Sequence, residues 1–155
     1  MSSQPVVTLP DAAATHDLGR RFGVAARRGD VLLLEGDLGA GKTTLAQGLA
    51  AGLGVTGPVT SPTFALQHDY RGRLALAHLD LYRLALAEVA SMGLAEAWLD
   101  PAGVVVIEWP ERLAGQLQPD DALHVRLAAE GDARSATFVG ATGRGLAWWQ
   151  EAAGA

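Results

Sequence analysis

The feature that most constrains this chain is the stretch GDLGAGKTT at residues 36–44, which matches the pattern G-x-x-x-x-G-K-[ST]. This pattern is typical of a phosphate-binding loop, in which glycines let successive backbone N–H groups turn inward around a polyphosphate. The apolar run VLLL at 31–34 precedes it and fits a strand buried on both faces. After it, Leu45, Leu49 and Leu53 recur every fourth residue, as on the buried face of a helix. The sequence therefore predicts a strand, a loop and a helix whose positive end points at phosphate groups.

Two side chains of the loop carry specific expectations. Lys42 is expected to reach the β- and γ-phosphates, and the hydroxyl of Thr43 to bind Mg²⁺. The chain has 12 lysine and arginine residues, and all of them except Lys42 are arginine. The alternative is a glycine-rich turn that ends in Gly-Lys-Thr by chance. The strand and the helix predicted on either side argue against that alternative.

Composition excludes several classes of protein. With 155 residues, 49% hydrophobic and 19% charged, residues 1–155 are expected to form one globular domain. The absence of cysteine excludes disulfides and thiolate metal sites. No run approaches the ~20 apolar residues of a membrane span, and the first residues do not resemble a signal peptide, so we expect a cytoplasmic protein. A net charge of -5 argues against autonomous nucleic-acid binding, so a partner is expected to hold any RNA.

Apolar periodicity predicts alternating strands and helices. Asp11 can cap the first helix, and the Arg71-Gly72 dipeptide fits the turn of a β-hairpin at an antiparallel edge. We expect an α/β, three-layer fold of the P-loop NTPase type, with a mostly parallel central sheet, an antiparallel hairpin and helices on both faces. The expected strands are 6–9, 31–34, 64–70, 73–79, 104–109, 120–129 and 134–140. The expected helices run from Asp11 to before Gly29, from the loop to about Leu53, over 88–99 and over 144–152.

Two acidic residues follow apolar strands. Glu108 ends the run VVVIE and is the first candidate for a Mg²⁺ ligand, whereas Asp80 is the candidate for positioning the attacking water or a metal-bound water. The alternative for each is an ordinary surface carboxylate at a strand end. The histidines, His78 among them, have no ligand-like spacing and are interpreted as structural. Trp109 either stacks on a base or a partner, or belongs to the core.

The stretch TSPTF at 60–64 allows two interpretations. It is either a loop that leads into a strand, as Ser-Pro favours, or a segment whose hydroxyls approach a γ-phosphate and its metal. Spacing alone does not choose between them.

Several separated stretches, in this order and spacing, closely resemble the bacterial TsaE family. The elements DLYRL at 80–84 and EWP at 108–110 are specific to that family, whereas the phosphate loop is shared with many hydrolases. The resemblance covers about Leu9 to Arg134, which is most of the chain. Its stretches are LPD at 9–11, GDLGAGKTT at 36–44, TSPTF at 60–64, HLDLYRL at 78–84, MG at 92–93 and IEWPE at 107–111.

The resemblance implies a Mg²⁺-dependent ATPase that is needed to form threonylcarbamoyladenosine on tRNA, at the adenosine beside the anticodon. Family members act with TsaD, which transfers the threonylcarbamoyl group, and with TsaB, which supports TsaD. The tRNA would then be met only indirectly, through the complex. The sequence contains no asparagine, so the Asn-Lys-x-Asp element by which many GTPases bind guanine is absent and ATP is the expected nucleotide.

The resemblance also implies roles for individual residues. Thr43 and Glu108 would bind Mg²⁺, and Asp80 together with Lys42 would serve hydrolysis. Many family members have an acid where Ala12 stands, so a nucleotide contact there would use Asp11 or the backbone. The phosphate-binding residues would be Gly39, Ala40, Gly41, Lys42, Thr43 and Thr44, with further nucleotide contacts from Glu111 and Arg134.

Two other functional classes remain open. A small-molecule kinase would use the same phosphate loop but would need an acceptor pocket and arginines near it, such as Arg71, Arg73, Arg83 or Arg112. A nucleotide-gated binding module would bind ATP with negligible turnover. Metabolite-dependent turnover would indicate the kinase, and tight binding without turnover would indicate the module.

Overall fold

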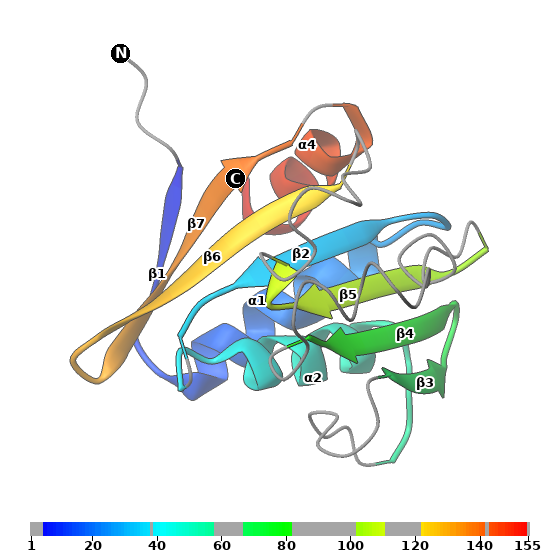
Figure 1. Ribbon diagram of the computed structural model, residues 1–155, viewed down its shortest axis with the longest axis horizontal. Helices are drawn as coiled ribbons and strands as arrows, with labels where there is room; N and C mark the ends of the chain where they lie inside the picture. Colours follow the sequence, from blue (N-terminus) through cyan, green and yellow to red (C-terminus); the bar gives the residue numbers. More distant parts are fainter. Residues whose placement is uncertain are drawn as a thin grey trace.

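A seven-stranded sheet forms the centre of the computed structural model, with the strand order β1-β7-β6-β2-β5-β4-β3 (Figure 1). The model describes residues 5–37, 39–57, 67–81, 102–110, 122–141 and 143–154. The strands are β1 (Val6–Leu9), β2 (Val31–Glu35), β3 (Gln67–Arg71), β4 (Ala75–Asp80), β5 (Val104–Glu108), β6 (Leu123–Glu130) and β7 (Ala133–Gly140). The helical segments are α1 (Ala12–Ala25), α2 (Lys42–Gly52), α4 (Gly143–Trp149) and the π-helical η3 (Gln150–Gly154).

The centre of the sheet is parallel and both of its edges are antiparallel. β2 pairs in parallel with β5 and β6, and β4 pairs in parallel with β5. β3 pairs antiparallel with β4 at one edge, while β7 pairs antiparallel with both β6 and β1 at the other. The predicted α/β class, the parallel centre and the antiparallel hairpin are therefore confirmed. The second strand of that hairpin begins at Ala75, two residues later than expected.

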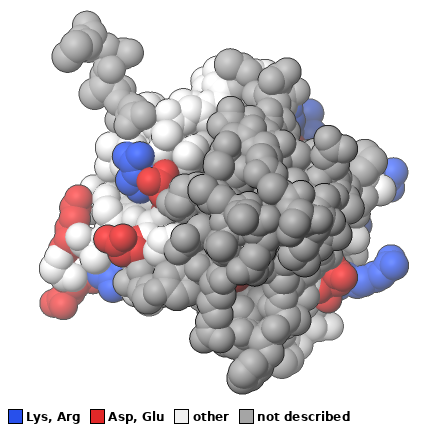
Figure 2. Space-filling view, viewed as in Figure 1, with Lys and Arg blue, Asp and Glu red and all other residues white. Residues whose placement is uncertain are grey.

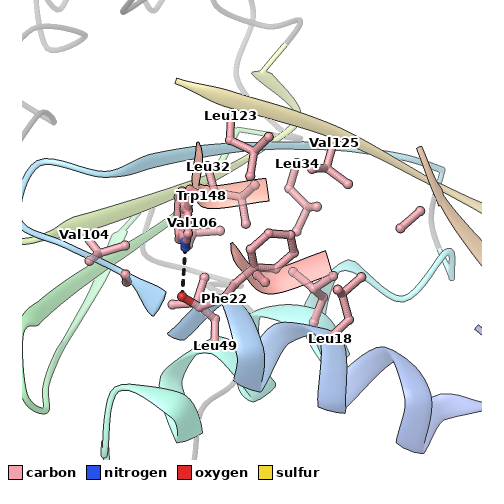
Figure 3. Packing of buried hydrophobic residues seen from close by; sticks show 14 of the residues in the cluster. Leu18, Phe22, Leu32, Leu34, Leu49, Val104, Val106, Leu123, Val125 and Trp148 are labelled. Carbon is pink, nitrogen blue, oxygen red and sulfur yellow. Dashed lines mark hydrogen bonds between the residues drawn. The ribbon is translucent and has the colours of Figure 1, made fainter. Parts of the chain in front are cut away.

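The central strands are apolar on both faces, as the uninterrupted run at 31–34 predicted. Leu32 and Leu34 point into one hydrophobic cluster, and Val31 and Leu33 into another on the opposite face. Figure 3 shows the first cluster, in which Leu32 and Leu34 pack with Phe22 of α1 and Trp148 of α4. All described helices contribute to this cluster. The helix expected over 88–99 lies outside the described residues.

Helices α1 and α2 pack so closely that glycines are required where they touch. A Cβ at Gly48 would lie 2.0 Å from the carbonyl oxygen of His16, and a Cβ at Gly19 would lie 2.1 Å from that of Leu45. Gly23 and Gly52 meet in the same way one turn further along. Because the obstructing atoms are backbone, a side chain at these positions would force the helices apart. Residues 12–15 of α1 are therefore held at a fixed distance from the start of α2.

Two arginines bind the carboxyl end of α1. Arg73 donates to the carbonyl oxygens of Gly23 and Ala26 at 2.9 and 3.0 Å. Arg144 donates to the carbonyl oxygen of Ala25 at 2.8 Å and forms two bonds of 2.9 Å with the buried carboxylate of Asp30. These side chains satisfy carbonyl groups that a helix end leaves without an intrahelical donor.

The tryptophans of the terminal helix pack against α1 and β7. The indole N–H of Trp148 donates to the carbonyl oxygen of Phe22 at 2.9 Å, and the two rings meet edge to face with centroids 5.6 Å apart. Trp149 packs between Phe22 and Phe138.

On the face seen in Figure 2, the described acidic and basic side chains are interspersed. None of the described helices is long and apolar enough to cross a membrane.

Candidate functional site

The loop at 36–44 joins β2 to α2 at the carboxyl end of the parallel strands. Gly39 and Gly41 have φ angles of 81° and 105°, which lie in the left-handed region that favours glycine. Gly41 is the N-cap of α2, and no side chain caps the helix at this position. The strand, loop and helix predicted around the motif are therefore present, with the positive end of α2 at the loop. In open α/β sheets, ligands bind in the crevice at the carboxyl ends of the parallel strands, at the point where the strand order reverses.

A cavity of about 370 Å³ lies at this end of the sheet. Its volume falls within the range of small-molecule sites. Residues from five parts of the chain line it: Ala12 and Thr15 of α1; Gly39, Gly41, Lys42, Thr43 and Thr44 of the loop and α2; Asp80; Glu108 and Trp109; and Asp132 and Arg134. The structure thus brings together the loop, both candidate acids and Arg134.

Lys42 is buried in this cavity, with 5% of its surface exposed. Its Nζ donates to the carbonyl oxygen of Gly36 at 2.5 Å and lies 3.7 Å from the centroid of the Trp109 ring. A cation over an indole face is attracted by the ring quadrupole. The lysine is therefore folded back onto the first carbonyl of its own loop, beneath the indole.

Trp109 has an unusual backbone conformation. Its φ angle is 61°, the only positive φ of a non-glycine residue in the described part of the chain. Such a conformation costs on the order of 1–3 kcal/mol and is concentrated at functional sites. The sequence left open whether this tryptophan stacks on a ligand or belongs to the core, and the structure places it against Lys42 in the cavity wall.

The two candidate acids lie opposite each other. Asp80 is the register partner of Glu108 in the β4–β5 pair, so both carboxylates belong to the same edge of the sheet. Glu108 is 2% exposed, whereas Asp80 is half-buried. His78 Nε2 lies 2.5 Å from Glu108 Oε2, and both side chains are buried. The sequence interpretation of His78 as structural did not include this contact, because it required knowing that β4 lies next to β5.

The opposite wall of the cavity comes from α1 and the β6–β7 turn. Arg134 donates to the carbonyl oxygens of Gly131 and Ala133, at 3.3 and 2.9 Å, and lies opposite Leu9 in the β1–β7 pair. Asp132 and Thr15 also line the cavity, although the sequence analysis did not select them. They have no motif of their own: the packing of α1 against α2 brings Thr15 here, and the pairing of β7 with β6 and β1 brings Asp132.

Two of the expected nucleotide-binding residues, Asp11 and Ala40, do not line this cavity. Asp11 does not line the cavity, because its carboxylate accepts the N–H of Ala14 at 2.8 Å and caps α1. Ala40 is buried and lines a second cavity of about 290 Å³ on the other side of the loop, together with Trp109 and Glu35. Glu111 and the stretch at 60–64 lie outside the described residues.

The donor set fits a magnesium ion that is shared with a phosphate ligand. The hydroxyl of Thr43 and the carboxylates of Asp80 and Glu108 line one cavity. Within the described ranges, no group of three His, Cys, Asp or Glu residues could enclose a metal by itself. Mg²⁺ is commonly held by one or two carboxylates, substrate phosphates and water, so an enclosing protein cage is not needed.

Comparisons with known proteins find a matching family model, similar sequences and a similar structure. The family model described as "Threonylcarbamoyl adenosine biosynthesis protein TsaE" matches residues 9–136. The tRNA threonylcarbamoyladenosine biosynthesis protein TsaE of Synechocystis is 48% identical over 109 residues, which cover 68% of this chain and 69% of the relative. The protein of the same name from Bacillus subtilis is 44% identical over 127 residues, covering 81% of this chain and 78% of the relative. The crystal structure of YdiB from Bacillus subtilis superposes with a TM-score of 0.82 at 34% identity, covering 99% of this chain and 96% of that one.

Proposed function

This chain belongs to the TsaE family, and we propose that it binds and hydrolyses ATP as the Mg²⁺-dependent component of the machinery that forms threonylcarbamoyladenosine on tRNA. The family model and the relatives are named for threonylcarbamoyladenosine biosynthesis, and the relatives' name includes tRNA. The hydrolytic step is our inference from the cavity.

The observation that carries this proposal is the convergence of three kinds of group on one cavity. The phosphate loop supplies backbone N–H groups and the only lysine, Thr43 supplies a hydroxyl, and two carboxylates stand opposite each other on β4 and β5. Phosphoryl transfer requires positioning and charge stabilisation more than covalent chemistry. The cavity contains the groups for both.

Each residue has a defined task in this proposal. On nucleotide binding, Lys42 would leave the carbonyl oxygen of Gly36 and the Trp109 ring and bind the β- and γ-phosphate oxygens instead. Thr43 and Glu108 would hold Mg²⁺, which would neutralise phosphate charge during the reaction. Asp80, opposite Glu108, would accept a hydrogen bond from the attacking water and orient it towards the γ-phosphate.

The partners are also part of the proposal. We expect TsaD and TsaB to hold the tRNA and to control turnover, while this chain meets the tRNA only through them. The net charge of -5 supports this division, because direct tRNA binding would rest on a basic surface.

The test is ATP hydrolysis by the purified protein, alone and with TsaB and TsaD of the same source. We expect slow turnover alone and a clear rise with the pair. Turnover that the pair does not change would contradict the dependence on partners. Turnover that instead requires a small metabolite would support the kinase alternative, and tight ATP binding without turnover, even with the pair, would support the gated binding module.

A further inference from the structure

We propose that His78 is a positioning residue that holds the Glu108 carboxylate in the orientation required for Mg²⁺. This inference deepens the proposed function and rests on it. Its basis is the 2.5 Å contact between His78 Nε2 and Glu108 Oε2 inside the sheet.

Strand pairing explains why these two side chains meet. Residues 78 and 80 lie on the same face of β4, because side chains alternate along a strand. Asp80 is the register partner of Glu108, so His78 is a diagonal neighbour of Glu108 on that face. The imidazole therefore reaches the glutamate from below the cavity rather than from within it, and His78 does not line the cavity.

The surroundings of the imidazole determine which atom donates. His78 is 1% exposed, and its Nδ1 is buried with no hydrogen-bond partner in the part of the chain that the structure describes. A buried N–H without an acceptor is costlier and rarer than a buried acceptor without a donor. The tautomer with its proton on Nε2 leaves only a lone pair at Nδ1, so Nε2–H donates to Oε2.

This bond leaves Glu108 with one oxygen, Oε1, for a cation or for water bound to it. Magnesium requires near-octahedral geometry, and a glutamate has three rotatable side-chain bonds. A donor fixed on Oε2 limits the directions in which Oε1 can point. Groups that orient a metal-binding side chain in this way typically change metal affinity about 10- to 100-fold when they are removed.

The experiment compares His78→Leu with His78→Gln. The amide N–H of glutamine can donate over a distance similar to Nε2, whereas leucine cannot donate. The readout is the dissociation constant of Mn²⁺, measured by EPR in the presence of the non-hydrolysable analogue AMP-PNP. Nucleotide affinity in EDTA and the melting temperature are measured in parallel.

We expect His78→Leu to weaken Mn²⁺ binding about 10-fold or more, with nucleotide affinity in EDTA unchanged. His78→Gln should retain most of the wild-type affinity for Mn²⁺. The chain contains a matched control, since His124 Nε2 contacts Glu35 Oε2 at 2.9 Å away from the first cavity. His124→Leu should leave Mn²⁺ binding unchanged.

Normal Mn²⁺ affinity in His78→Leu, or an equal loss in His78→Leu and His78→Gln, would overturn the proposal. A second measurement uses His78→Ala, which removes the donor without introducing a larger apolar side chain. If His78 acts through Glu108, then His78→Ala should weaken Mn²⁺ binding in the wild-type background but have no further effect in a Glu108→Gln background, and an additive loss would contradict this. Wild-type protein that binds neither AMP-PNP nor Mn²⁺ would overturn the proposed function itself, which separates the two failures.

Discussion

Replacing Gly48 by alanine should damage both stability and nucleotide binding, although Gly48 does not line the cavity. The new Cβ would lie 2.0 Å from the His16 carbonyl oxygen, 2.9 Å from the His16 carbonyl carbon and 3.0 Å from the Arg20 nitrogen. An ordinary carbon–oxygen contact is about 3.3 Å or more. All three obstacles are backbone atoms, so α1 and α2 would have to separate by on the order of 1 Å.

The expected magnitude combines two opposing effects. Overpacking costs about 1–3 kcal/mol, and the upper end applies here because no side chain can rotate away. Alanine returns about 1 kcal/mol through its higher helix propensity. The net loss should be about 2 kcal/mol, which for a protein of this size lowers the melting temperature by roughly 4–8 °C.

The assay is thermal unfolding together with ATP affinity. Affinity should fall because separation moves Ala12 and Thr15 of α1 away from Lys42 across the cavity. The matched control is Gly140→Ala, since nothing lies within 4 Å of the Cβ it would add. That variant should stay within about 0.5 kcal/mol of wild type. A Gly48→Ala protein as stable as wild type, with normal ATP affinity, would refute the close-packing argument.

Three further predictions concern single side chains. Lys42→Ala should abolish measurable ATP binding by calorimetry, and normal affinity and turnover in that variant would contradict the loop assignment. Glu108→Ala should weaken Mg²⁺-dependent binding more than Asp80→Ala does, whereas Asp80→Ala should chiefly lower turnover; the reverse order would exchange the two roles. Arg144→Met should cost about 3 kcal/mol in chemical denaturation, because it leaves the buried Asp30 carboxylate without its cation. Burial disfavours the charged form of Arg144, but the hydrogen bonds and charge of Asp30 outweigh this and raise its pKa. Arg144 therefore stays charged throughout the neutral range, and the loss should be equal from about pH 6 to about pH 9; a loss that varied across this interval would point to another cause.

The central strands and the phosphate loop could be predicted because their signals are local. The run at 31–34 is apolar at every position, which fits a strand buried on both faces, and the loop pattern occupies consecutive residues. Glu108 and Asp80 could also be selected from the sequence as cavity residues, because each is the last residue of an apolar strand.

The rest of the site depends on which strands become neighbours. His78 reaches Glu108 only because β4 lies beside β5, and Asp132 enters the cavity only because β7 pairs with β6 and β1. No pattern in the sequence states these pairings. Asp11 is a case in which two predictions concern the same carboxylate. The sequence predicts it both as the cap of α1 and as a nucleotide contact, and in this structure it accepts the N–H of Ala14 as the helix cap.

The solitary lysine gives the molecule an unusual chemical profile. Because every other basic side chain is an arginine, Lys42 carries the only side-chain amine, and it is buried beneath an indole. Amine-directed acylation and crosslinking reagents therefore find no exposed side-chain target on the folded chain. The rate at which the Lys42 amine is modified, measured by mass spectrometry, thus reports how often this amine becomes accessible to reagent. A nucleotide bound in the cavity should slow that modification.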